Sequence, residues 1–147
     1  KVVALLSKDL EQVASEVQVS KFRYVDVIEK STGNLLQTSS EIVGTLSANW
    51  YDHLGDILVK LLPAGSICGA PREKTMEIIQ EAETYDRGYY TGIAGIFDGY
   101  SLNTCVLIRF IERIGEKFYY KSGAGITAYS NPESEYKEIL EKIYIPN

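Results

Sequence analysis

The sequence has few of the residues that build metal clusters and disulfide frameworks. Its 147 residues include two cysteines, Cys68 and Cys105, and a single histidine, His53. No Cys-x-x-Cys pair and no zinc-type Cys/His spacing is present, so neither a structural zinc site nor a set of disulfides is predicted. So few cysteines fit a reducing compartment, and we expect a cytoplasmic location.

Long hydrophobic runs and an excess of basic charge are also missing. No apolar run approaches the roughly 20 residues that a membrane-spanning helix needs, and residues 1–7 are too short and poorly flanked for a secretory signal. The formal net charge is −5, which leaves no basic footprint for nucleic acid or for an anionic membrane. An anionic ligand therefore needs a local cluster of cations.

The remaining composition is that of an ordinary globular protein. With 45% hydrophobic and 24% charged residues, the chain is long enough for one domain with a hydrophobic core. The first residue, Lys1, is not methionine and lies inside a helical pattern. We therefore predict that residues 1–147 are a single-domain fragment of a longer protein.

Hydrophobic periodicity predicts a mixture of helices and strands. In chain order, the predicted elements are a helix over 3–13, strands over 17–27 and 35–46, a helix over 47–61, a loop over 63–71, a helix over 71–82, strands over 89–97, 102–112 and 117–121, and a helix from 132. Turns are expected at 31–34, Asp98-Gly99 and Gly115, and Ser47 is the expected N-cap of the helix over 47–61. This order predicts an α+β fold with a layered antiparallel sheet and flanking helices.

The stretch from Gly123 to Glu138 is the strongest candidate for a site. Gly123 and Gly125 follow the last strand, and without side chains they allow a ligand or another backbone to come close. Asn131 and Pro132 then open a helix with proline in its first turn.

This last helix is predicted to have two different faces. Its apolar stripe consists of Tyr136, Ile139, Leu140 and Ile143. Glu135, Glu138 and Lys142 line up along the flank of that stripe. One interpretation is an exposed Glu138–Lys142 ion pair, worth only about 0.2–0.5 kcal/mol. The interpretation favoured by the neighbouring glycines is a site for a hard cation such as Mg²⁺ together with an anionic ligand.

Two further residues are candidates for ligand contacts. Tyr90 is a large polar side chain among small neighbours in the strand predicted over 89–97. Arg109 lies in the strand predicted over 102–112, which is apolar on both faces and therefore expected in the interior. A buried arginine needs an anionic partner, which is either a local glutamate or a ligand.

Two other polar features receive structural interpretations. The loop over 63–71 lacks the GxxxxGK[ST] pattern of a P-loop. It is either a helix N-terminus that holds an anion or a tight connection, and the connection is favoured. His53 is expected at the surface or the edge of the core, and not as a ligand.

Three stretches together resemble the chorismate-utilising enzymes. They are residues 63–79, which include Gly65-Ser66-Ile67-Cys68-Gly69-Ala70-Pro71-Arg72, then Arg87-Gly88-Tyr89-Tyr90-Thr91-Gly92, and the block from Gly123 to Glu138. The resemblance covers essentially the whole chain but only the C-terminal part of such an enzyme, with its anthranilate synthase-like fold. Within the family it is most similar to component I of aminodeoxychorismate synthase, also called para-aminobenzoate synthase, judging in addition from the ending Glu141 to Pro146.

The resemblance implies an enzyme that aminates chorismate. The reaction converts chorismate and ammonia to 4-amino-4-deoxychorismate in para-aminobenzoate and folate biosynthesis, with Mg²⁺ as cofactor and ammonia supplied by a glutamine amidotransferase subunit. Related alternatives are component I of anthranilate synthase and the isochorismate or salicylate synthases. An alternative of another class is a truncated, non-catalytic domain that keeps the fold.

The resemblance also implies roles for particular residues. Glu138 and its partner Glu135 match the Mg²⁺ carboxylates. The expected substrate contacts are Tyr90 and Arg109 on a carboxylate of chorismate, Lys142 just past the metal helix acid, and the backbone of Gly123 and Gly125.

Three departures from the family pattern accompany these matches. Gln37 stands where the family usually has a histidine, and Arg72 stands where it usually has a lysine. The family's nucleophilic lysine and its other metal glutamates would lie before Lys1. No catalytic nucleophile is therefore expected within the chain, and the isolated chain is expected to be inactive.

Overall fold

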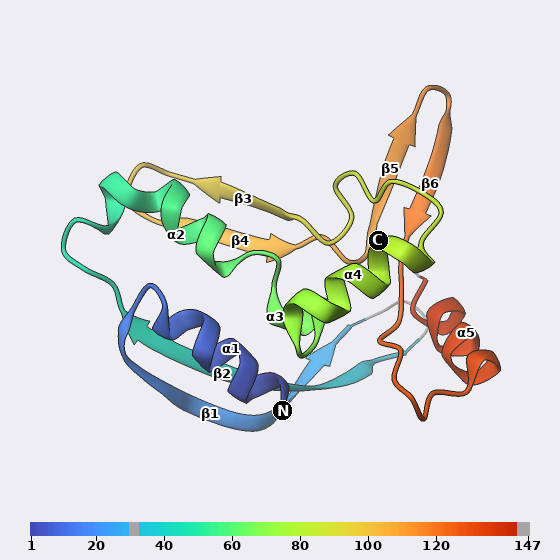
Figure 1. Cartoon of the computed structure of the whole chain (residues 1–147), viewed down its shortest axis with the longest axis horizontal. Helices are drawn as coiled ribbons and strands as arrows, with labels where there is room; N and C mark the ends of the chain where they lie inside the picture. The colour runs from blue at the N-terminus through green and yellow to red at the C-terminus, as the bar shows by residue number, and fades with distance from the viewer. Residues whose placement is uncertain (30–32, 144–147) are drawn as a thin grey trace. The chain divides into compact units, whose positions relative to one another are not determined.

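The structure is a computed structural model that describes residues 1–29 and 33–143. In chain order its elements are α1 (Val2–Glu11), β1 (Ser15–Ile28), β2 (Leu35–Thr45), η1 (Trp50–His53), α2 (Leu54–Leu61), α3 (Gly65–Cys68), α4 (Arg72–Ala82), β3 (Ile93–Phe97), β4 (Leu102–Val106), β5 (Phe110–Ile114), β6 (Lys117–Lys121) and α5 (Pro132–Glu141) (Figure 1). Part of the turn predicted at 31–34, and the ending 144–146, lie outside the described residues.

The chain divides into two compact units, residues 1–86 and 87–146. That they act together as one domain stays a prediction. In the described part of the chain, no single helix is long and apolar enough to cross a membrane. One bent pair, Trp50–Cys68 with Arg72–Ala82, meets the length and composition requirements only when its two helices are taken together.

In the first unit, α1 lies along the antiparallel hairpin formed by β1 and β2 (Figure 1). Both strands were predicted, but β1 is irregular. The register shifts three times, and Glu16 and Arg23 take positive φ angles of 52° near two of these shifts. Such irregularities break simple alternation, and Phe22 and Val25 are left 65% and 61% exposed.

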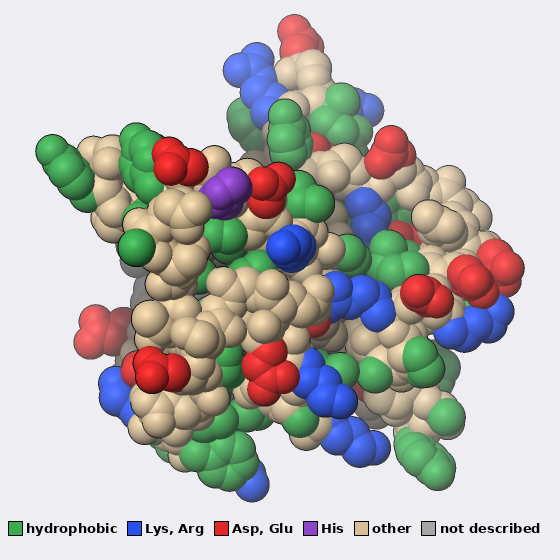
Figure 2. Space-filling view, turned by 60° about the vertical axis from the view of Figure 1, so that its left-hand side comes forward, with side chains coloured by type: hydrophobic (Ala, Val, Ile, Leu, Met, Phe, Trp, Pro, Cys, Tyr) green, Lys and Arg blue, Asp and Glu red, His purple; other side chains and the backbone are tan. Residues whose placement is uncertain are grey.

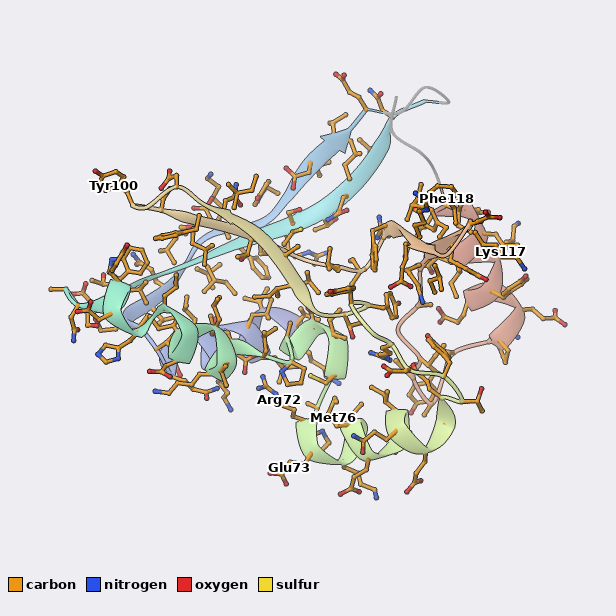
Figure 3. The ribbon with its side chains drawn as sticks, turned by 90° about the horizontal axis from the view of Figure 1, so that it is seen from above. Arg72, Glu73, Met76, Tyr100, Lys117 and Phe118 are labelled. Atoms are coloured by element: carbon orange, nitrogen blue, oxygen red, sulfur yellow. The ribbon has the colours of Figure 1, made fainter. Side chains whose placement is uncertain are left out.

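A tight joint connects α1, α3 and α4. Cys68 is 1% exposed, and its thiol donates to the carbonyl oxygens of Pro63 and Ala64. Asp9 of α1 is 9% exposed and pairs with Arg72. Arg72 is the first residue of α4 and is labelled in Figure 3. The segment over 63–71 joins α2 to α4 and contains the short helix α3, which the sequence did not predict. That it serves only as a connection and holds no anion stays a prediction.

Gly65 makes this joint possible. A Cβ atom at Gly65 would lie 2.6 Å from Oδ2 of Asp9 and 3.5 Å from Cβ of Leu5. Only a residue without a side chain lets α3 approach α1 so closely.

The predicted cap at Ser47 is wrong. The helical segment begins with the single turn η1 and continues as α2, and neither N-cap residue, Asn49 or His53, makes a side-chain capping hydrogen bond. Ser47 contributes only its backbone carbonyl, which accepts from the N–H of Trp50 at 3.0 Å. His53 is half exposed and lies 3.5 Å from Asp56, as expected for a surface residue.

The second unit contains two antiparallel hairpins, β3–β4 and β5–β6. Their turns lie at Asp98-Gly99 and Gly115, as predicted. Two predicted strands are wrong in extent, since residues 89–92 form a turn before β3 and residues 107–109 interrupt the strand predicted over 102–112.

The prediction of an α+β fold with antiparallel strands is confirmed, but a layered sheet is not observed. The described strands form three separate two-stranded sheets. Cys68 is the only hydrophobic residue of the described chain that is buried, and apolar side chains lie open on the face in Figure 2. The interior strand expected over 102–112 is also wrong, because Ile108 and Ile111 are 37% and 46% exposed. Isolated two-stranded hairpins are marginally stable, so these faces need further packing partners.

Candidate functional site

The helix α5 begins where the sequence predicts. Asn131 is its N-cap, and the side-chain oxygen of Asn131 accepts from the N–H of Ser134 at 3.1 Å. Pro132 occupies the first helical position, where its missing N–H costs nothing. Glu133 and Glu135 lie in the first turn, where the helix dipole favours acidic side chains.

No residue of α5 is buried. The predicted apolar stripe is largely open, with Tyr136 63% and Leu140 50% exposed. Glu135 and Lys142 on the polar flank are partly exposed, as is Ile139 on the apolar stripe, whereas Glu138 is exposed. The polar flank, which carries the predicted site residues, is therefore no more exposed than the apolar stripe.

Glu138 and Lys142 form an ion pair along this flank. The hydrogen bond from Lys142 holds the pKa of Glu138 below its ordinary value, and the charges of Lys142 and Arg109 act in the same direction. The ion pair is the structural interpretation that the sequence left open. The influence of Arg109 adds a second cation near the same carboxylate.

Glu135 is held by a residue that the sequence interpretation missed. The hydroxyl of Ser130 donates to Oε1 of Glu135 at 2.7 Å and accepts from the N–H of Thr127 at 3.1 Å. A serine five residues before an acid, at the end of a turn, is the only sequence signal for this contact. Ser130 thus ties the carboxylate to the segment that leads into α5.

Tyr90 lies in the turn before β3 and not in a strand, so its predicted strand position is wrong. The N–H of Tyr90 is bonded to the carbonyl of Arg87 at 2.9 Å. The next residue, Thr91, donates its N–H to Leu107, just beyond β4. This places Tyr90 at the end of the β3–β4 hairpin opposite the turn at Asp98-Gly99.

Arg109 and Gly123 flank the corresponding end of the β5–β6 hairpin. The last pair of that hairpin joins Phe110 to Lys121, so Arg109 precedes it and Gly123 follows it. Arg109 is partly buried in the break between β4 and β5, and not inside a strand as predicted. The hydroxyl of Tyr90 lies directly against Gly123, at 2.1 Å from the position that a Cβ atom would occupy there.

The structure says less about the other candidates, Gly125 and Gln37. An added Cβ atom at Gly125 would have no atom within 4 Å, and its expected substrate contact stays a prediction. Gln37 lies exposed in β2 of the first unit, opposite Asp26. A further ion pair in the second unit joins Lys121 to Glu112 at 3.0 Å, with each side chain 19% exposed, and no sequence pattern indicated it.

The donor atoms suit part of a magnesium site. Glu135 and Glu138 lie one turn apart on α5, and Mg²⁺ commonly uses one or two carboxylates and keeps several waters. Among the described residues, no group of three or more histidine, cysteine or acidic side chains is placed to hold a metal. The two glutamates could therefore supply some, but not all, of the ligands of a magnesium ion.

Comparisons with known proteins agree on one family. A family model described as chorismate binding enzyme matches residues 1–146. The chain is 59% identical over 145 residues to an uncharacterized PabA-like protein of Haemophilus influenzae, covering 99% of this chain and 44% of that protein. It is 38% identical to aminodeoxychorismate synthase component 1 of Bacillus subtilis, covering 97% of this chain and 30% of that protein.

A third relative carries a different activity in its name. The chain is 36% identical to anthranilate synthase component 1 of Archaeoglobus fulgidus, covering 96% of this chain and 33% of that protein. The chain thus spans less than half the length of each of these three relatives.

Proposed function

Because this chain belongs to the chorismate-binding enzyme family, we propose that its second unit holds chorismate between a cationic cluster and a Mg²⁺ ion. The observation that carries the proposal is the polar flank of α5. It combines the carboxylates of Glu135 and Glu138 with Lys142, and the charge of Arg109 acts on Glu138. Such a mixture of acids and cations suits a substrate that bears carboxylates and is held through a metal ion.

The chemistry assigned to these residues is binding and charge stabilisation. When bound by Glu135 and Glu138, Mg²⁺ supplies a Lewis acid that neutralises a substrate carboxylate. Arg109 and Lys142 offer charge-assisted hydrogen bonds to the same substrate. Tyr90 orients the substrate by donating a hydrogen bond from its hydroxyl group to a carboxylate oxygen.

We propose amination of chorismate to 4-amino-4-deoxychorismate as the reaction, which is the first step towards para-aminobenzoate and folate. The similarity to the Bacillus subtilis aminodeoxychorismate synthase component 1 supports it. Formation of anthranilate is the second candidate, on the similarity to the Archaeoglobus fulgidus protein. The family pattern favours the first, because Gln37 stands where the family usually has a histidine and a glutamine cannot deliver or accept a proton.

The proposed enzyme needs more polypeptide than this chain. The described hairpins leave large apolar side chains open, with Phe118 70% and Ile96 79% exposed, and the relatives are more than twice as long. We propose that residues corresponding to the unmatched part of the relatives cover these faces and supply the nucleophile and the remaining metal ligands. A glutamine amidotransferase subunit is the proposed source of ammonia.

The binding role of α5 is tested by two glutamate variants in the complete protein that contains this segment. Glu138→Gln is expected to abolish Mg²⁺-dependent chorismate binding, measured by isothermal titration calorimetry with and without the metal. Glu141→Gln is the matched control, because Glu141 lies on the same helix, is 67% exposed and is 3.9 Å from Lys137. Equal binding by both variants would reject α5 as the metal-binding helix.

The reaction is tested by its products. The complete enzyme, given chorismate, Mg²⁺ and an ammonium salt, is expected to accumulate 4-amino-4-deoxychorismate and to release little pyruvate without an added lyase. Pyruvate is followed by coupling to lactate dehydrogenase, and anthranilate by its fluorescence. Stoichiometric anthranilate would assign the second candidate activity, and turnover by the pure 147-residue chain would contradict the need for further polypeptide.

A further inference from the structure

Gly123 lies so close to Tyr90 that a side chain at position 123 would displace the tyrosine hydroxyl. A Cβ atom added to Gly123 would lie 2.1 Å from the hydroxyl oxygen of Tyr90 and 3.3 Å from Cζ of its ring. Real Cβ atoms essentially never come within 3.0 Å of another heavy atom. Unlike Gly88 and Gly115, Gly123 does not have a positive φ. Glycine fits here because the tyrosine hydroxyl occupies the space that a side chain would need, and not because of the backbone conformation.

The backbone next to Tyr90 is strained. Thr91 has a φ of 69°, which is a clear outlier for a β-branched residue. Such strain persists where the surroundings determine the conformation, and it concentrates at functional sites. The surroundings here are the N–H of Thr91, bonded to the carbonyl of Leu107 at 2.8 Å, and its hydroxyl, which donates to the carbonyl of Tyr90.

Arg87 holds the same turn from its other end. Its guanidinium donates from Nη1 to the hydroxyl of Thr91 at 3.0 Å and lies 5.5 Å from the centre of the Tyr90 ring. This distance is within the range of a cation–π contact. One side chain therefore restrains both the strained residue and the aromatic ring beside it.

We propose that Arg87, Thr91 and Gly123 are positioning residues that hold the Tyr90 hydroxyl at the end of β6. The hydroxyl held in this way is the group that the proposed function offers to a substrate carboxylate. The substrate contact that the sequence resemblance implies for the backbone of Gly123 stays a prediction. The part of the proposal that concerns substrate rests on the proposed function, whereas the seating of Tyr90 does not.

The seating is tested without any ligand. The complete protein that contains this chain is labelled with 3-fluorotyrosine, and the ¹⁹F resonance of Tyr90 is identified by its loss in Tyr90→Phe. Gly123→Ala is expected to shift that resonance, whereas Gly125→Ala is the matched control because an added Cβ there meets no atom within 4 Å. An unmoved resonance in Gly123→Ala, or equal shifts in both variants, would overturn the seating.

A folding defect in Gly123→Ala is distinguished by a second variant. Without the hydroxyl the closest contact disappears, so Gly123→Ala combined with Tyr90→Phe is expected to recover the unfolding midpoint of Tyr90→Phe alone. No recovery would show that Gly123 serves another purpose and would overturn the proposal.

The role of Arg87 in holding Tyr90 is tested by comparing two arginine variants. Arg87→Leu is expected to shift the Tyr90 resonance. Arg113→Leu is not, although Arg113 lies 5.9 Å from the ring of Phe118 and donates to the carbonyl of Gly115. If the Tyr90 resonance is unchanged in Arg87→Leu, the arginine is not a positioning residue.

The substrate part is tested by a double-mutant cycle on chorismate affinity in the complete protein. Gly123→Ala alone is expected to weaken binding by about tenfold or more, the loss of one hydrogen bond to a charged group. In the Tyr90→Phe background the same change is expected to have little effect. Equal losses in both backgrounds would mean that Gly123 contacts the substrate directly. If the unmodified protein does not bind chorismate, the proposed function fails, while the ¹⁹F result still decides the seating.

Discussion

Replacing Arg72 by methionine tests the joint that holds the first unit together. Arg72 pairs with Asp9, which lies 63 residues earlier and is 9% exposed. Methionine keeps most of the aliphatic stem and removes the charge. The carboxylate of Asp9 would then remain buried, and its Oδ2 atom already lacks a hydrogen-bond partner.

The magnitude follows from the exposure of the two side chains. Removing one partner of a fully buried ion pair costs about 3–5 kcal/mol, whereas an exposed pair contributes about 0–1 kcal/mol. The side chain of Arg72 is 32% exposed and that of Asp9 is 12% exposed, so the pair lies between these limits. We expect Arg72→Met to cost about 2–3 kcal/mol, which corresponds to a fall in Tm on the order of 5–10 °C for a chain of this size.

The assay is urea unfolding followed by the fluorescence of Trp50, the single tryptophan, which lies in the same unit. Arg72→Lys is the matched variant, because lysine keeps the charge while losing the planar guanidinium, and it is expected to cost clearly less. Asp9→Asn combined with Arg72→Met should recover part of the loss, since no buried charge is left unpaired. A change below about 0.5 kcal/mol for Arg72→Met, the range of ordinary surface substitutions, would refute the reasoning.

Three further predictions concern the second unit. Lys142→Met is expected to raise the pKa of Glu138 towards its ordinary value, measured by NMR titration of the carboxyl carbon; an unchanged pKa would mean that the ion pair is absent in solution. Asp98→Ala is expected to destabilise the β3–β4 hairpin, because the carboxylate accepts from the N–H groups of Ser101 and Tyr100, which lower its pKa. The stabilisation by the Asp98 carboxylate is present above its ordinary pKa of 3.8 and is lost as pH falls through the lowered pKa of the folded state. The effect of Asp98→Ala, measured by amide exchange, should therefore vanish in acid. Ser130→Ala is expected to weaken Mg²⁺ binding by the complete protein in calorimetry without unfolding α5, because it releases the carboxylate of Glu135; unchanged affinity would exclude Ser130 as a support for the metal ligand.

Elements with local causes were predictable from the sequence. The start of α5 follows from Asn131 and Pro132, whose cap and fixed φ act within one turn. The turn after β3 follows from Asp98, whose carboxylate accepts from residues two and three positions later. The two glutamates on one flank of α5 follow from the helical repeat alone.

Contacts between distant residues were decided by the tertiary structure. Periodicity states which residues of α5 share a face, but it does not state how far each is covered, and Glu135, Ile139 and Lys142 are partly covered on both faces. Tyr90 and Gly123 meet because two hairpins end near the same point. No local sequence pattern predicts the break between β4 and β5 at Arg109 or the strained φ of Thr91. The sequence by itself determined the family, the hairpin turns and the acids of the candidate site. The seat of Tyr90 required the tertiary structure, because steric exclusion between residues 33 positions apart depends on how the strands between them pair.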